Sequence, residues 1–258
     1  MNADEQARRA LALLDLTDLG DAVTADDTHA LCRRALSPHG NVAAVCLWPR
    51  WVATAVGDLA GTGVRIATVT NFPSGAEPTA DVRAQTEVAL ADGADDIDVV
   101  LRYRDVMAGR VGEAADALRA IREIVPQDDG HVLKVILETG EIGDADTIRL
   151  AAQLAVDEGA DFIKTSTGKT PVSASLAATA IMLDVIAGAG RPVGLKPSGG
   201  IRTLADAGAY LAQADQTMGP SWASARTFRF GASGLLDALL AVIDRSETVG
   251  SARNEQGY

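Results

Sequence analysis

Two stretches of the chain, DGADDIDVV at residues 92–100 and EGADFIKTS at residues 158–166, repeat one pattern. Each has a glycine at its second position, continues through Ala-Asp, and enters a short run rich in apolar residues. The segments that precede the glycines, 82–93 and 146–159, carry apolar residues at helical spacing and end at the glycine. A helix, a glycine stop and a buried strand form the repeating unit of parallel α/β folds.

The same alternation of strand-like runs and amphipathic segments extends from about residue 41 to residue 240. The predicted strands are NVAAVCLW (41–48), VRIATVTN (64–71), DIDVVL (96–101), VLKVILET (132–139), DFIKTST (161–167), VGLKPSG (193–199), a weak one near QTMG (216–219), and TFRFGAS (227–233). Eight strands, each followed by a helix, predict an α/β fold with a single closed (β/α)8 TIM barrel. The alternative is an open doubly wound sheet, but NVAAVCLWPR lacks the glycine-rich fingerprint that often follows its first strand.

The length of 258 residues fits one barrel domain, 1–258, and no linker divides it. Residues 1–40 are predicted to form an N-terminal helical extension that covers one barrel end, and residues 41–245 the barrel itself. Residues 246–258, SETVGSARNEQGY, are polar and are expected to form a flexible C-terminal tail.

Composition restricts the classes of partner. A net charge of −12 argues against nucleic acid or an anionic membrane as partner, although a local pocket can still hold one small phosphorylated ligand. The N-terminus lacks the apolar core of a signal peptide, and no apolar run is long enough to span a bilayer, so we expect a cytoplasmic protein. Two cysteines imply no disulfide framework, and three scattered histidines predict no metal site.

Lysine is rare in this chain, which makes each lysine informative. The 23 basic residues comprise 19 arginines and only Lys134, Lys164, Lys169 and Lys196. An arginine serves as a surface cation but not as a nucleophilic amine, whereas lysine can do both. All four lysines lie in or just after strand-like runs, so we suspect a chemical role, with chance as the alternative.

Charged residues interrupt three of the apolar runs. Asp98 lies between Ile97 and Val99, Lys164 follows Phe162-Ile163, and Lys196 follows Val193-Gly194-Leu195. A buried charge is costly unless it is paired or used. Together with Lys134, on the strand between those of Asp98 and Lys164, these residues predict a polar centre inside the barrel.

The two lysines of neighbouring strands suggest a mechanism. Parallel strands lie about 4.8 Å apart, so inward-pointing ammonium groups of Lys164 and Lys196 would be close neighbours. At about 5 Å and an effective dielectric of about 20, two like charges repel by about 3 kcal/mol, which favours a neutral, nucleophilic amine. The alternative is that one lysine forms a structural ion pair with Asp98.

Three glycine-containing turns follow late strands and suggest a phosphate site, because glycine lets backbone amides approach an anion and a helix N-terminus favours its charge. A barrel commonly binds phosphate in its late loops. The turns are Thr167-Gly168-Lys169-Thr170, Ser198-Gly199-Gly200 with Ile201-Arg202, and Gly231-Ala232-Ser233-Gly234.

With these residues located, the chain resembles the deoxyribose-phosphate aldolases over essentially its whole length. FIKTSTGKT (162–170) is similar to their Schiff-base segment and VGLKPSGGIRT (193–203) to their second-lysine segment. Further segments match in order and spacing: LLDLTDL near the N-terminus, RIATVTNFPSG (65–75), DDIDVVLRYRDVMAG (95–109), LKVILETGE (133–141) and RFGASGLL (229–236).

The resemblance implies a metal-independent class I aldolase without a cofactor, which reversibly cleaves 2-deoxy-D-ribose 5-phosphate to acetaldehyde and D-glyceraldehyde 3-phosphate. Lys164 would be the Schiff-base nucleophile, Lys196 the cation that tunes it, and Asp98 the general acid/base, acting through a water. A homodimer is also plausible by resemblance. The positions matched to substrate or phosphate binding are Asp15, Thr17, Cys46, Gly168, Lys169, Gly199, Gly200, Arg202, Ser233 and the terminal Tyr258, while Thr167 and Gly234 belong to the turns described above.

Two positions depart from the family pattern. Gly234 stands where a second serine is common, and Ser198 where alanine is common beside the second lysine. Two other functions stay open at this point: a Schiff-base barrel aldolase for a different phosphosugar, and a catalytically silent barrel that binds a phosphosugar for regulation.

Overall fold

The computed structural model describes residues 1–127 and 130–255. Within them, eight parallel strands form one sheet in the order β10-β1-β4-β5-β6-β7-β8-β9. Their bounds are β1 Leu14–Asp18, β4 Ala44–Leu47, β5 Arg65–Thr70, β6 Asp96–Val100, β7 Val132–Ile136, β8 Phe162–Lys164, β9 Gly194–Lys196 and β10 Phe230–Ala232.

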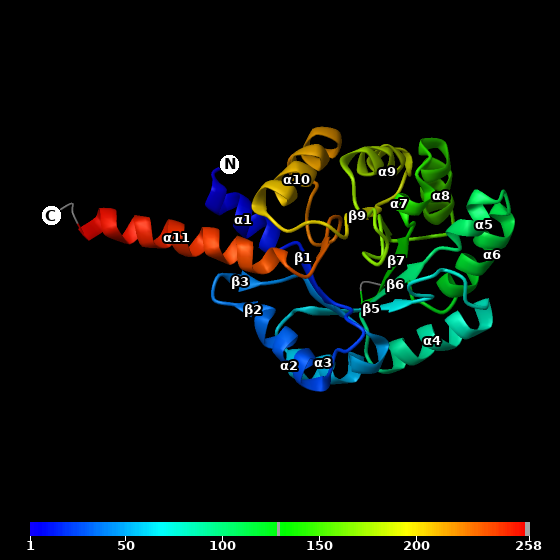
Figure 1. Cartoon of the computed structure of the whole chain (residues 1–258), viewed down its shortest axis with the longest axis horizontal. Coiled ribbons are helices and arrows are strands. Elements are labelled where there is room, and N and C mark those ends of the chain that lie inside the picture. The colour runs from blue at the N-terminus through cyan, green and yellow to red at the C-terminus, as the bar shows by residue number, and fades with distance from the viewer. Residues whose placement is uncertain (128–129, 256–258) are drawn as a thin grey trace.

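The two edge strands of this order, β9 and β10, close the sheet into a barrel. Parallel bridges pair Leu195 with Phe228 and Ser198 with Gly231. The amide of Gly231 donates to the carbonyl of Pro197 at 2.9 Å. The predicted TIM barrel is therefore confirmed, and Figure 1 shows its helices around the outside.

The helices alternate with the strands along the chain. Their bounds are α1 Ala3–Leu11, α2 Ala25–Arg34, α3 Val52–Leu59, α4 Thr79–Ala91, α5 Tyr103–Met107, α6 Val111–Arg122, α7 Thr139–Ile142, α8 Ala145–Asp157, α9 Leu176–Gly188, α10 Leu204–Met218 and α11 Leu235–Glu255, with a 3-10 turn η1 at Pro49–Trp51 and a small hairpin of β2 Leu36–Ser37 and β3 Gly40–Asn41. Among the described residues, none of these helices combines the length and apolar character needed to cross a bilayer.

The repeated motif that predicted the fold forms the same structure twice. After α4 and α8, Gly93 and Gly159 adopt positive φ angles of 98° and 87°, a region that glycine reaches without steric cost. The aspartate that follows each motif alanine, Asp95 or Asp161, accepts a backbone N–H from the preceding strand, at 2.7 Å and 2.8 Å respectively. Each motif thus ends a helix and sets the register of the next strand.

Two predicted boundaries are wrong. The segment 1–40 contains α1 and α2, but Leu14–Asp18 between them is a barrel strand, so the barrel begins well before residue 41. The weak strand at 216–219 is instead the end of α10, a helix that Thr203 and Asp206 cap. A run of five residues is too short for its periodicity to distinguish strand from helix. One strand was missed and one was wrongly predicted, so the number of strands is unchanged. Each strand from Ala44–Leu47 to Gly194–Lys196 therefore stands one place later in the barrel than predicted.

The expected flexible tail is also wrong for most of its length. α11 continues to Glu255 and extends away from the barrel (Figure 1). Its middle is tied to the β2–β3 hairpin, because Asp244 pairs with His39 at 2.7 Å. Tyr258 lies outside the described residues.

The interior below the lysines is filled by an aromatic ring. Phe162 of β8 pairs in register with Gly194 of β9, and both precede a lysine by two residues. A Cβ atom on Gly194 would lie 2.4–2.6 Å from the ring of Phe162, closer than atoms can approach. Gly194 is therefore required by the ring.

We predict that Gly194→Ala destabilises the fold by about 1–3 kcal/mol, the usual cost of overpacking a core. Chemical denaturation measures the difference. The control is Gly57→Ala in the middle of α3, where a Cβ meets nothing within 4 Å; this change should raise stability by up to about 1 kcal/mol through helix propensity. Equal effects of the two substitutions would contradict the packing role of Gly194.

Candidate active site

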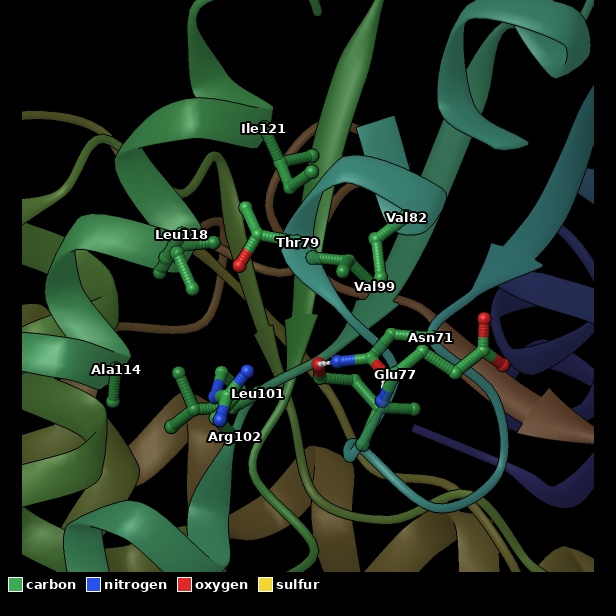
Figure 2. A pocket seen from close by; sticks show the side chains of 12 residues that line it. Asn71, Glu77, Thr79, Val82, Val99, Leu101, Arg102, Ala114, Leu118 and Ile121 are labelled. Carbon is green, nitrogen blue, oxygen red and sulfur yellow. Dashed lines mark hydrogen bonds between the residues drawn. The ribbon is translucent and has the colours of Figure 1, made fainter. Parts of the chain in front are cut away.

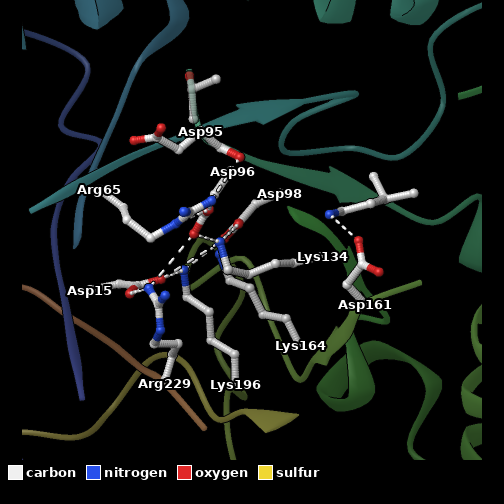
Figure 3. Close-up of polar contacts among 12 residues, drawn as sticks. Asp15, Arg65, Asp95, Asp96, Asp98, Lys134, Asp161, Lys164, Lys196 and Arg229 are labelled. Carbon is white, nitrogen blue, oxygen red and sulfur yellow. Dashed lines mark hydrogen bonds and ion pairs between the residues drawn. The ribbon is translucent and has the colours of Figure 1, made fainter. Parts of the chain in front are cut away.

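A cluster of charged side chains lies inside the barrel, at the carboxyl ends of β8 and β9 (Figure 3). Lys164 pairs in register with Lys196, and Asp98 pairs with Lys134. Paired residues of neighbouring strands point to the same side of a sheet, so these four side chains share the barrel interior. Lys134, Lys196 and Asp98 are fully buried, and Lys164 is 2% exposed.

Asp98 accepts hydrogen bonds from all three lysines. Its Oδ2 accepts from Lys164 Nζ and from Lys196 Nζ, each at 2.8 Å, and its Oδ1 accepts from Lys134 Nζ at 3.0 Å. The amines of Lys164 and Lys196 are therefore neighbours, as the sequence predicts. A carboxylate oxygen lies between them, however, so simple repulsion between two lysines does not describe the site. The ion pair weighed as an alternative forms with both lysines.

Further charged side chains pair with this group. Lys196 Nζ also donates to Asp15 Oδ2 at 2.5 Å, and Arg229 donates to Asp15 Oδ1 at 2.7 Å. Lys134 Nζ donates to Asp96 Oδ2 at 2.5 Å. Each carboxylate thus has a cation on two sides, which is the arrangement that makes buried charge tolerable.

These contacts fix the charge states of the carboxylates. Burial alone would raise the pKa of Asp98, but Lys134, Lys164 and Lys196 outweigh it and hold that pKa well below its usual range. The pKa of Asp15 is lowered in the same way, with burial opposed by Lys196, Arg229 and Lys134. Burial would lower the pKa of Lys196, but the carboxylates of Asp15 and Asp98 raise it, so Lys196 stays a cation at neutral pH.

Lys164 differs from the other two lysines in its number of ionic partners. It pairs with one carboxylate, that of Asp98, whereas Lys196 pairs with Asp98 and Asp15, and Lys134 with Asp98 and Asp96. Cations outnumber carboxylates in the cluster, because Arg229 and Arg65 also face Asp15 and Asp96. Among the three lysines of the cluster, Lys164 is thus held by the fewest ion pairs within the described residues.

An open pocket of about 590 Å³ lies at the mouth of the barrel. It reaches the cluster at Gly231, where a Cβ atom would lie 3.1 Å from Lys196 Cε. Its walls come from the loops after β1, β8, β9 and β10. The predicted residues that line it are Thr17, Thr167, Gly168, Lys169, Gly199, Gly200, Arg202, Ser233 and Gly234.

Two predicted binding residues lie elsewhere. Asp15 is part of the buried cluster rather than of the pocket wall. Cys46 is fully buried on β4 close to the cluster, and burial raises the pKa of its thiol, which keeps it neutral. Tyr258 is not among the described residues.

One end of the pocket has the chemistry of an anion site. The amides of Gly200, Ser233 and Gly234 donate to no protein acceptor within the described chain, and Ser233-Gly234 directly precede α11. A helix N-terminus with free amides favours a phosphate. With the corrected strand order, these turns follow the last two strands of the barrel, the usual phosphate position of this architecture.

Another recess, on the outside of the barrel beside α4 and α6, does not compete with this pocket (Figure 2). It holds about 20 Å³, space for little more than a water molecule. The side-chain amide of Asn71 donates to the carbonyl of Val100 at 2.8 Å within this recess. Asn71 therefore has a structural role there. Within the described residues, no group of His, Cys, Asp and Glu is arranged to hold a metal ion.

Residues 9–240 match the family model of the DeoC/LacD family aldolases. The chain belongs to this aldolase family. The deoxyribose-phosphate aldolase of Agrobacterium fabrum is 49% identical over 255 residues, which cover 98% of this chain and 96% of that protein.

Solved structures agree with this family membership. A structure from Toxoplasma gondii, described as a candidate deoxyribose-phosphate aldolase, has 25% identity and a TM-score of 0.84, and covers 94% of this chain and 98% of that one. One from Coccidioides immitis with the same description has 29% identity and a TM-score of 0.80, and covers 93% and 87%. The family resemblance seen in the sequence is thus confirmed.

Sequence reasoning missed part of this aldolase's charge cluster. Asp96 and Arg229 were not singled out, although each stands two residues from a position that was, Asp98 or Gly231. The spacing of two that puts strand residues on one face was the available signal. Glu138 was not singled out either, although it stands two such spacings after Lys134.

The lowered pKa of Asp98 predicts how this aldolase responds to acid. A carboxylate with a depressed pKa stabilises the fold above its unfolded pKa, near 3.9, and this contribution is lost as the pH falls towards the folded pKa. Asp98→Asn should therefore cost about 3–5 kcal/mol at pH 7, because it leaves buried ammonium groups unpaired. The difference from the wild type should stay constant down to about pH 5 and shrink by about 1 kcal/mol by pH 3.

Urea unfolding at these pH values measures the difference. The control is Asp184→Asn, since Asp184 is exposed and lies 3.5 Å from Arg149; it should change stability little at any pH. A cost of Asp98→Asn that does not depend on pH would contradict a lowered pKa of Asp98 in the fold.

Proposed function

We propose that this aldolase reversibly cleaves 2-deoxy-D-ribose 5-phosphate to D-glyceraldehyde 3-phosphate and acetaldehyde, with Lys164 as the Schiff-base amine. The observation that carries the proposal is the position of Lys164. Its buried amine has one ionic partner among the described residues, Asp98, and Lys196 of the same cluster lies against Gly231, which lines the open pocket with the anion site.

The reaction begins at the amine. Lys164 attacks C1 of the open-chain aldehyde, and loss of water gives a protonated imine that acts as an electron sink. Asp98 Oδ2, which accepts from Lys164 Nζ in the free enzyme, is placed to stabilise this positive charge. Deprotonation of the C3 hydroxyl then breaks the C2–C3 bond and releases D-glyceraldehyde 3-phosphate.

The remaining enamine is protonated at carbon and hydrolysed to acetaldehyde. Lys196 and Asp98 share a hydrogen bond beside Lys164, so they are positioned to pass protons to and from a water near the imine. In the free enzyme Lys196 would be a cation beside Lys164, because Asp15 and Asp98 raise its pKa. Cys46, buried close to the cluster, would stay neutral and would not react.

The pocket supports a phosphorylated substrate. Its open amides at Gly200, Ser233 and Gly234 would bind the phosphate, and Lys169 and Arg202 would supply positive charge. Gly234 has open space where a side chain would project, so the missing hydroxyl of the family pattern changes the donors but not the room. A cytoplasmic location and a homodimer stay predictions from the sequence.

We predict that borohydride, added with acetaldehyde, traps an ethyl group on Lys164, because reduction fixes the imine between this amine and the aldehyde. Peptide mass spectrometry locates the adduct. Lys164→Arg should form none, and Lys169→Arg should still form it, since Lys169 lies in the pocket wall outside the cluster. An adduct only on Lys134, or none at all, would contradict the proposal.

The same experiment separates the remaining alternatives. A regulatory barrel without catalysis would form no adduct and release no acetaldehyde from 2-deoxyribose 5-phosphate. An aldolase for a different phosphosugar could form an imine on Lys164, but it would turn over 2-deoxyribose 5-phosphate poorly in a coupled assay for glyceraldehyde 3-phosphate.

We predict that Lys196→Leu lowers turnover by at least about 100-fold at neutral pH, the usual size of a lost acid/base partner. The substitution removes the cation that pairs with both Asp15 and Asp98. Steady-state assays give the value, with Lys169→Leu as the control that should mainly raise KM. Near-normal turnover of Lys196→Leu would refute its role.

A further inference from the structure

Glu138 has an unusual backbone conformation directly after β7. Its φ and ψ angles are 58° and 55°, in the left-handed region that residues other than glycine and asparagine rarely adopt. Its side chain is fully buried. A residue held in such a conformation at the mouth of a barrel invites a functional explanation.

The carboxylate of Glu138 is held only by the loop that follows β8. Its Oε2 accepts from Thr167 Oγ1 at 2.5 Å and from the Thr167 amide at 3.3 Å, and its Oε1 accepts from Thr170 Oγ1 at 3.2 Å. No lysine or arginine of the described chain forms an ion pair with it. A buried carboxylate needs such donors, so the loop and Glu138 constrain each other.

The backbone on either side of Glu138 binds the strand that carries Lys164. The amide of Leu137 donates to the carbonyl of Lys164, and the amide of Thr139 donates to the carbonyl of Thr165, both at 2.9 Å. Because Glu138 is left-handed, the amides of Leu137 and Thr139 reach Lys164 and Thr165. The carboxylate of Glu138 reaches the loop that follows β8.

The loop fixed in this way forms one wall of the pocket. Thr167 Oγ1, which donates to Glu138, also accepts from the amide of Lys169 at 3.1 Å. Gly168, with a φ angle of 78°, packs against Gly199 so closely that a Cβ atom on Gly199 would lie 3.3 Å from Gly168 Cα. The hydrogen bonds of Thr167 are thus used within the protein, and they place Gly168 and Lys169 beside the turn at Gly199.

We propose that Glu138 is a positioning residue for phosphate recognition: it holds the 167–170 loop so that Gly168 and Lys169 face the phosphate of the substrate. The inference rests on the proposed function, because it takes the pocket as the phosphate site. Glu138 acts through Thr167 and Thr170 and does not contact the substrate. Its effect should therefore depend on whether the substrate carries a phosphate.

The test compares Glu138→Gln with the wild type on two substrates, 2-deoxyribose 5-phosphate and unphosphorylated 2-deoxyribose. Glutamine keeps the size but removes the charge that holds three donors. We expect kcat/KM for the phosphorylated sugar to fall about 10- to 100-fold, mostly through KM, the loss typical of hydrogen bonds to a charged group. For 2-deoxyribose we expect kcat/KM to change by less than about threefold. We also expect inorganic phosphate to inhibit the variant more weakly than the wild type.

Glu141→Gln is the matched control, because Glu141 lies on the same short helix, α7, and is exposed. It should behave as the wild type on both sugars. Should Glu138→Gln fail to fold, Thr170→Val removes a single donor to the carboxylate and should shift the same ratio in the same direction by a smaller factor.

A loss of equal size on both sugars would overturn the inference, since it would mean that Glu138 supports the fold or the chemistry in general. Unchanged kinetics on both sugars would overturn it as well. A wild type that shows no preference for the phosphorylated sugar would contradict the phosphate pocket itself, and so the proposed function would fail before the role of Glu138 is tested.

Discussion

The sharing of one buried carboxylate, Asp98, by three lysine amines is the interaction on which the rest of the site depends. These groups are buried, so every charge must find its partner in the protein. Asp98 can satisfy Lys134, Lys164 and Lys196 together only because the barrel brings β6, β7, β8 and β9 side by side. Asp15 and Asp96 then take up the remaining charge of Lys196 and Lys134. Among the described residues Lys164 is left with a single ionic partner, and this asymmetry is why we propose it as the reacting amine.

In the proposed function, binding and chemistry lie at different levels along the barrel axis. Phe162 and Gly194 fill the level below the lysines, the charge cluster forms the next level, and the glycine turns form the mouth. Packing is dense at the level of Phe162 and Gly194, which supports the strands that carry the two lysines. The loops above carry the donors for an anion, and Glu138 ties one of these loops to the strand that holds Lys164. A change in the loop can therefore alter the choice of substrate while the cluster keeps its geometry.

The sequence alone predicts the barrel and the central residues, because repeated helix-glycine-strand units and charges within apolar runs are local signals. It does not reveal β1, since LDLTD at residues 14–18 is short and follows a helix, and its strand partners are distant in sequence. Strand spacing likewise predicts Lys164 and Lys196 as neighbours but does not show that Asp98 Oδ2 lies between their amines, because that contact depends on the tertiary structure. Thr167 was predicted to bind the ligand as part of a glycine turn, whereas its hydroxyl and amide are bound to Glu138. Such pairings join residues about thirty positions apart and depend on tertiary structure.

The central claim is that Lys164 reacts while Asp98 stays beside its nitrogen and Lys196 remains paired with Asp15. A crystal structure of the enzyme reduced by borohydride in the presence of acetaldehyde tests this most directly. We expect density for an ethyl group on Lys164 Nζ, with Asp98 Oδ2 still within hydrogen-bonding distance of that nitrogen and of Lys196 Nζ. Density on another lysine, or an Asp98 carboxylate turned away from the modified nitrogen, would contradict the account.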